Sequence, residues 1–167
     1  MKSFIAIANS ILLQDLPHDG VFVDFTMTDG YDTLYMAQYV SEGNVVAFEK
    51  NEDEVDRAYA LFESNFQDNA HIVLDNPLNA KKYVRENING FSIDAVKDDL
   101  DPVTTIKLID LALELTEVGG KGMLIADDNM TEVKEHVDNM PESKVKVMAI
   151  SMANVDTPTS YIIEKLA

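Results

Sequence analysis

Residues 21–33 read VFVDFTMTDGYDT, and residues 44–49 read NVVAFE. The near-continuous apolar run from Val21 to Phe25 is typical of a strand buried on both faces, and the run from Asn44 to Phe48 repeats that pattern. The segment between the two runs is long enough for one crossover helix. The sequence therefore predicts a βαβ unit, and with it a parallel sheet with a right-handed crossover.

Two residues indicate what this unit binds. Gly30 permits a tight loop after the first strand, so that the next helix points its N-terminal amides at the crevice above the sheet. Glu49 ends the second strand about twenty residues further on, where an acidic side chain accepts hydrogen bonds from ribose hydroxyls. A nucleoside-containing ligand is the first expectation.

Length and composition limit the class of protein. Of the 167 residues, 46% are hydrophobic, and we expect a single domain covering residues 1–167 that buries roughly 70% of its unfolded surface. No apolar run approaches the ~20 residues of a membrane span, and the first residues lack the features of a signal peptide. We therefore expect a cytoplasmic protein without a membrane partner. The absence of cysteine excludes disulfides and thiol nucleophiles.

The net charge is -17, from 13 basic and 30 acidic residues. A nucleic-acid binder must replace counterions on phosphates with Lys and Arg, so extensive nucleic-acid binding is not expected. The small basic clusters at residues 81–85 and 144–146 are better explained as solvated faces. Such acidity is more typical of a highly soluble protein, of one with a cationic partner, or of a high-salt setting.

Apolar spacing and capping signals predict the first helices. An amphipathic helix is expected over residues 3–16. Asn51 and Glu54 have the spacing of a capping box at the start of a second helix after the βαβ unit. Asn76, followed by proline, supplies the N-cap of a helix that reaches about Asn87.

The second half of the chain repeats these signals. Asp101, again followed by proline, begins a strongly apolar helix that the glycines at 119–120 end, and Asn129 opens a helix to about Met140. Short apolar runs predict further strands at residues 71–75, 91–96, 123–126, 144–151 and 159–164.

Strands and helices alternate until the last two strands, which are joined only by residues 152–158. A connection of that length joins antiparallel neighbours but not parallel ones, so the last strand is expected to be antiparallel. A seven-stranded, mostly parallel sheet of this kind looks like the class I methyltransferase sheet, a three-layer Rossmann-like α/β fold.

The segment DFTMTDGYDT at residues 24–33 resembles DATMGNGHDT, the first motif of the small bacterial S-adenosylmethionine (SAM)-dependent methyltransferases labelled rRNA methylases, some of which modify the wobble uridine of tRNA. Six of the ten positions agree. Further similarities follow in the same order along the chain, at residues 48–49, 105–107, 156–158 and 163–165.

The resemblance implies SAM as the cofactor, but it implies no catalytic residue. It places Asp24 and Gly30 at the methionine end of the cofactor, Glu49 at the ribose and Asp75 near the adenine amino group. A turn role for Asp75 is an equal alternative. The complete set of cofactor-binding residues that the resemblance implies is Asp24, Thr26, Gly30, Asp32, Thr33, Glu49, Asp75 and Asp98.

The chain also departs from the family. Thr28 replaces the first glycine of the motif, and a β-branched residue at a left-handed position costs roughly 1–2 kcal/mol. Asp29 and Asp32 add negative charge beside the cofactor carboxylate. After the fourth strand, residues 97–100 lead straight to the next helix, whereas the family has a longer loop that helps form the substrate pocket. These departures predict a divergent methyltransferase with an eroded acceptor site, acting on a small or cationic acceptor.

Two other functions stay open. A catalytically inactive SAM-binding or partner-binding regulatory protein, in one arrangement a homodimer, would keep the same fold. A nicotinamide-nucleotide protein is a weaker hypothesis, because residues 26–30, TMTDG, lack the GxGxxG spacing.

Acidic residues also follow the fourth and fifth strands, at 98–101 and 127–128. They could hold a hard cation or recognise an amine, but exposed loop carboxylates and helix caps are the favoured explanation. No metal-ligand spacing joins His18, His71 and His136, for which structural or solvent-facing roles are expected.

Overall fold

The computed structural model describes residues 4–167, so the expected start of the first helix at Ser3 lies outside the described residues. The sheet contains seven strands: β1 (Val21–Asp24), β2 (Asn44–Glu49), β3 (Ala70–Leu74), β4 (Ile88–Asp94), β5 (Thr116–Ala126), β6 (Val145–Ile150) and β7 (Thr159–Lys165). The helices are α1 (Phe4–Leu13), α2 (Tyr31–Tyr39), α3 (Glu52–Ser64), the 3₁₀ helix η1 (Pro77–Lys82), α4 (Pro102–Leu115) and α5 (Thr131–Asp138).

The strands lie in the order β3-β2-β1-β4-β5-β7-β6. Strands β1 to β5 pair in parallel, whereas β7 is antiparallel to both of its neighbours, β5 and β6. This is the class I methyltransferase sheet that the strand pattern predicts, including its antiparallel last strand.

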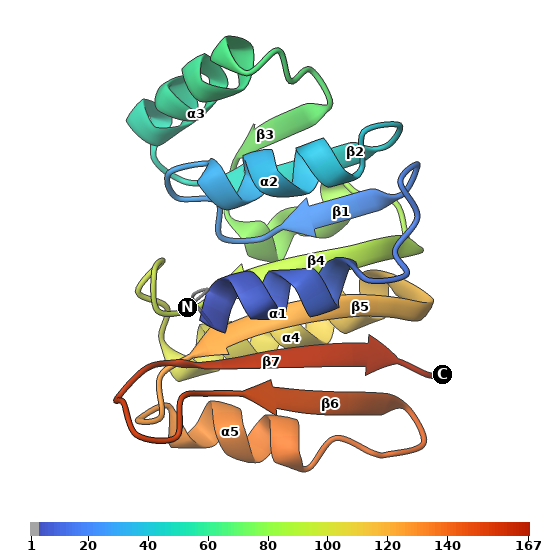
Figure 1. Cartoon of the computed structure of the whole chain (residues 1–167), viewed down its shortest axis with the longest axis vertical. Coiled ribbons are helices and arrows are strands. Elements are labelled where there is room, and N and C mark those ends of the chain that lie inside the picture. Colours follow the sequence, from blue (N-terminus) through green and yellow to red (C-terminus); the bar gives the residue numbers. More distant parts are fainter. Residues whose placement is uncertain (1–3) are drawn as a thin grey trace.

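The sheet is the middle of three layers (Figure 1). Helices α1, α2 and α3 cover one face and pack on side chains such as Phe22 and Met123. Helices η1, α4 and α5 cover the opposite face. They pack on Val23 in β1 and Leu124 in β5, which directly follow Phe22 and Met123 in the chain. This alternation gives inner strands such as β1 and β4 two buried faces, which explains their continuous apolar runs in the sequence. The edge strand β6 is mostly exposed.

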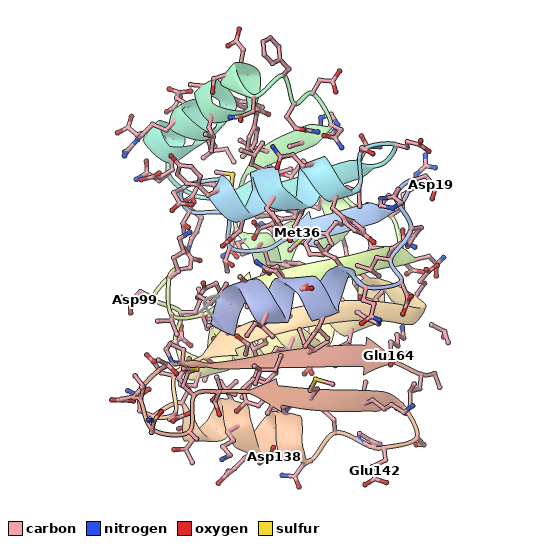
Figure 2. All side chains as sticks on the ribbon, in the orientation of Figure 1. Asp19, Met36, Asp99, Asp138, Glu142 and Glu164 are labelled. Atoms are coloured by element: carbon pink, nitrogen blue, oxygen red, sulfur yellow. The ribbon has the colours of Figure 1, made fainter. Side chains whose placement is uncertain are left out.

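The loops that follow β1, β2 and β4 lie together at one edge of the sheet, on the left in Figure 1. Figure 2 shows Asp99 at this edge and Asp19 and Glu142 at the opposite one. We call it the carboxyl edge, because the parallel strands end there. Ligands of open α/β sheets bind at this edge.

Three expected helix boundaries are wrong for physical reasons. The first helix, α1, ends at Leu13 rather than at Leu16, because Asp15 adopts a left-handed conformation at φ +66°. The helix after Asn76 is only the short η1, which ends at Lys82 rather than at Asn87. Side-chain contacts of Asp75, described below, hold this segment in a turn that competes with a continuing α-helix. In addition, α4 ends at Leu115, and the glycines at 119–120 lie inside β5, because Thr116 already pairs with β4.

Two expected capping contacts are also absent. Asn51 does cap α3, where its side chain accepts a hydrogen bond from the backbone of Asp53. However, the backbone N–H of Asn51 donates to Glu49 rather than to Glu54, so the capping box is incomplete. At α5 the N-cap position is Met130, not Asn129, and no side chain of the described residues caps this helix. Within residues 4–167, no helix is both long enough and apolar enough to span a bilayer.

Candidate cofactor site

Asp24, the last residue of β1, is buried at the carboxyl edge, with 2% of its surface exposed. Its Oδ1 accepts a hydrogen bond from the backbone of Thr26 at 3.0 Å, and its Oδ2 accepts one from Thr33 Oγ1 at 2.7 Å. Burial raises the pKa of Asp24 to about 7, although both hydrogen bonds act in the opposite direction. Asp24 therefore titrates near neutral pH, and a ligand cation would favour its charged form.

Thr26 fixes the loop after β1 to the neighbouring strands. Its Oγ1 accepts a hydrogen bond from the backbone N–H of Asp94, the last residue of β4, at 2.7 Å. On the other side of the loop, the N–H of Met27 donates to the carbonyl of Phe48 in β2 at 3.2 Å. The structure thus brings together three predicted site residues, Asp24, Thr26 and Thr33, in one hydrogen-bonded unit.

The loop then turns through two left-handed residues, Thr28 at φ +52° and Gly30 at φ +84°. The expected left-handed conformation of Thr28 is confirmed, and within the described residues its buried Oγ1 has no hydrogen-bond partner. A Cβ on Gly30 would lie 2.9 Å from Cβ of Ala58 in α3. Gly30 is therefore required both by its conformation and by the packing of α3.

Lys97, which the sequence analysis did not single out, lies in the loop after β4 and reaches the start of α2. Its Nζ is 2.8 Å from Asp29 Oδ1 and 3.8 Å from Asp32 Oδ2, and its backbone N–H donates to Asp94 Oδ1 at 2.9 Å. Partial burial alone would lower the pKa of Lys97, but the hydrogen bond to Asp29 and the nearby carboxylates raise it overall. Lys97 is therefore a permanent cation among three acids.

Asp94 is a second site residue that the sequence analysis missed. Burial raises the pKa of Asp94, and the charge of Asp32 adds to the effect. The only available sequence signal was its place at the end of an apolar run, equivalent to that of Asp24 in β1.

Glu49 is buried at the end of β2, with 8% of its surface exposed. Its Oε1 accepts hydrogen bonds from the backbone N–H groups of Lys50, at 2.7 Å, and Asn51, at 3.0 Å. These bonds hold the carboxylate at the start of α3. Within residues 4–167, Oε2 makes no hydrogen bond, which leaves an acceptor for a ligand hydroxyl.

Asp98 extends from the loop after β4 toward the end of β2. Partial burial raises the pKa of Asp98, while the charge of Lys50 lowers it and that of Glu49 raises it. The loop thus places a carboxylate within electrostatic range of two β2-end residues.

Asp75 lies at the end of β3, but its carboxylate is engaged within the protein. Oδ1 accepts hydrogen bonds from the backbone of Asn76, at 2.6 Å, and from Asn79 Nδ2, at 2.9 Å, and Oδ2 accepts one from the Tyr83 hydroxyl at 2.6 Å. The Tyr83 bond is the main reason that the pKa of Asp75 is lowered. These contacts support the turn role, and the adenine role stays a prediction.

The other polar clusters have structural contacts. Asp101 caps α4 by accepting a hydrogen bond from the backbone of Thr104 at 2.8 Å, and Asp128 accepts one from Thr159 Oγ1 at 3.0 Å. In the part of the chain that the structure describes, no three His, Cys, Asp or Glu residues are placed to hold a metal ion. His18 contacts Tyr39, His71 contacts Asn44, and His136 contacts Asp110.

Comparison with known proteins agrees with the fold and with the resemblance of residues 24–33. No protein-family model and no curated protein matches the chain. Among solved structures, an rRNA methylase from Streptococcus thermophilus has a TM-score of 0.89 at 26% identity, covering 100% of this chain and 99% of that one. A candidate rRNA methylase from Clostridium thermocellum has a TM-score of 0.90 at 20% identity, covering 100% and 98%.

A third structure was solved with a ligand. A candidate methyltransferase from Streptococcus mutans, in complex with S-adenosylhomocysteine (SAH), has a TM-score of 0.86 at 24% identity, covering 99% of both chains. The fold of our protein is therefore that of the class I SAM-dependent methyltransferases. Within that class, the chain resembles the rRNA methylases over its whole length, as predicted from the motif at residues 24–33.

Proposed function

We propose that this protein is a SAM-dependent methyltransferase whose acceptor site is reduced relative to that of the rRNA methylases. The observation that carries the proposal is the pair of buried carboxylates, Asp24 and Glu49, at the ends of adjacent strands β1 and β2. They lie at the carboxyl edge of a fold that holds SAH in the Streptococcus mutans protein.

The residues present fit the chemistry of SAM. Asp24 would accept hydrogen bonds from the ligand ammonium, whose charge favours the ionised carboxylate. Glu49 would use Oε2 for a ribose hydroxyl, since Oε1 is held by the start of α3. When bound, SAM supplies an electrophilic methyl group on a sulfonium. The task of the protein is then to hold the acceptor in line with that group, which requires no acid–base pair.

The acceptor that we propose is small or cationic. The net charge of -17 opposes the approach of a nucleic-acid backbone. In addition, Asp98 and Asp99 lie in the short loop between β4 and α4, beside the proposed cofactor site. The resemblance implies a longer loop here in the rRNA methylase family, and a shorter loop would fit a smaller acceptor pocket.

A partner-binding protein without methyl transfer is the second candidate. Two observations favour it: Thr28 places a branched side chain in the loop after β1, and β6 is an exposed edge strand. Val147 and Met148 in β6 have 39% and 52% of their surface exposed. In this proposal, a second copy of the chain would pair along β6 to form a homodimer.

Calorimetric titration with SAM and SAH separates the two proposals. Wild-type protein should bind both ligands with micromolar affinity, and Glu49→Ala should lose that affinity. Glu42→Ala is the matched control, because Glu42 is exposed in the turn before β2, away from the carboxyl edge. No binding at millimolar ligand would reject the cofactor assignment. If binding is found, methyl transfer to any amine acceptor would reject the second candidate.

A further inference from the structure

The ion pairs of Lys97 join two loops at the carboxyl edge. Lys97 comes from the loop after β4, whereas Asp29 and Asp32 lie on either side of Gly30 at the start of α2. The Lys97 side chain is 34% exposed, so it is held by the protein and still partly accessible to a ligand. A carboxylate oxygen, that of Asp29, already lies 2.8 Å from Nζ.

The charges around this ammonium explain why it matters for a ligand. Asp24 and Asp94 lie close enough for the charge of Lys97 to lower the pKa of each, against the larger effect of burial. Asp29 and Asp32 face the same ammonium. A ligand carboxylate entering this group of four acids would be repelled unless Lys97 received it.

We propose that Lys97 binds the carboxylate of the amino-acid part of the ligand, and that Asp29 competes with this carboxylate for the same ammonium. The inference rests on the proposed function. A partly exposed ion pair contributes little to stability, because water screens it and two side chains must be ordered. Exchanging one carboxylate for another at Nζ therefore costs little, and the pairs with Asp29 and Asp32 keep the ammonium in place until the ligand arrives.

The alternative is that Lys97 only links the two loops. The two roles differ in which ligands they affect. A ligand-binding Lys97 acts on SAH, which carries an amino-acid carboxylate, but not on 5′-methylthioadenosine, which shares the nucleoside and lacks the amino-acid part. A loop-linking Lys97 would shape the whole site and so affect both ligands.

The test is calorimetric titration of the wild type, Lys97→Met, Asp29→Asn and the double variant with SAH and with 5′-methylthioadenosine. Lys97→Met should weaken SAH binding about tenfold, the value of one charge-assisted hydrogen bond, and leave 5′-methylthioadenosine unchanged. Asp29→Asn should tighten SAH binding severalfold by removing the competitor, but only when Lys97 is present. Lys81→Met is the control. Lys81 pairs with Glu114 in α4, which packs on the face of the sheet opposite to α2.

Each other outcome overturns the inference. Equal weakening of both ligands by Lys97→Met would assign Lys97 to loop structure, and unchanged SAH binding would remove it from the site. If Lys97→Met does not fold, Asp29→Asn decides alone: without a gain specific to SAH, the inference fails. Wild-type protein that binds neither ligand rejects the proposed function itself, whereas SAH binding that ignores Lys97 and Asp29 rejects only this inference.

Discussion

Replacing Asp24 with Asn should make the protein more stable at neutral pH and remove one source of its pH dependence. The Asn side chain keeps the local contacts, because its Oδ1 accepts the bond from the backbone of Thr26 and its Nδ2 donates to Thr33 Oγ1. What the substitution removes is a carboxylate that must ionise while buried.

The magnitude follows from the pKa of Asp24, which is 3.8 in the unfolded chain and about 7 in the folded protein. Because the folded protein binds the proton of Asp24 more tightly than the unfolded chain does, this proton stabilises the fold. That contribution is complete below pH 3.8 and is lost as the pH rises through 7. At about 1.4 kcal/mol for each pH unit, the loss is about 4 kcal/mol. The free energy of unfolding of Asp24→Asn should therefore equal that of the wild type near pH 4 and exceed it by about 4 kcal/mol at pH 8.

Urea unfolding of both proteins at half-unit steps from pH 4 to 8.5 measures this difference. Asp75→Asn is the control with the opposite sign. The hydrogen bond from Tyr83 lowers the pKa of Asp75 in the wild type. The ionised Asp75 therefore stabilises the fold above pH 3.8, and this contribution is lost only as the pH falls below that value. The Asp75→Asn difference should therefore be constant from pH 5 to 8. A difference for Asp24→Asn that is also constant over this range would refute the reasoning.

Three further substitutions test the loop after β1 and the start of α3. Gly30→Ala should lower the free energy of unfolding by about 2–4 kcal/mol, from left-handed strain and from contact with Ala58. Gly119→Ala is its control: Gly119 has φ +88°, and no atom of residues 4–167 beyond its chain neighbours lies within 4 Å of the added Cβ, so the loss should be only about 1 kcal/mol. Thr28→Gly should raise the free energy of unfolding by about 1 kcal/mol, measured by thermal or urea unfolding, because it removes left-handed strain and a buried hydroxyl without a partner among the described residues. An unchanged free energy of unfolding would contradict the strain at Thr28. Asn51→Ala should cost about 1 kcal/mol by removing the α3 cap, and an unchanged urea midpoint would argue against it.

The sequence predicts the order of elements well because the inner strands, such as β1 and β4, are buried on both faces. Continuous apolar runs and the caps Asn51, Asn76 and Asp101 are local signals, and the structure confirms all three caps. The start of β5 at Thr116 depends instead on pairing with Ile88 in β4. No residue near Thr116 carries that information, so the sequence pattern predicts a helix that continues to the glycines at 119–120.

The candidate site divides in the same way. Asp24, Thr33 and Glu49 follow from their positions in a motif or at a strand end. The partnership of Lys97 with Asp29 joins residues 68 positions apart in the chain, and it depends on how two loops meet above the sheet. A lysine in an acidic loop has no spacing that would reveal such a partner.

Thr28 shows how the loop after β1 holds a strained residue in place. A strained residue persists only where its surroundings fix it, and this loop is fixed on both sides of Thr28: the N–H of Met27 donates to Phe48, and the N–H of Gly30 donates back to Met27. We therefore expect the backbone to keep this path when glycine replaces Thr28, with Asp24 and Thr33 in place. Thr28→Gly should therefore change the strain in the loop rather than where the carboxylates lie. For this reason, we expect Thr28→Gly to change the stability of the fold without moving the carboxylates of the proposed cofactor site.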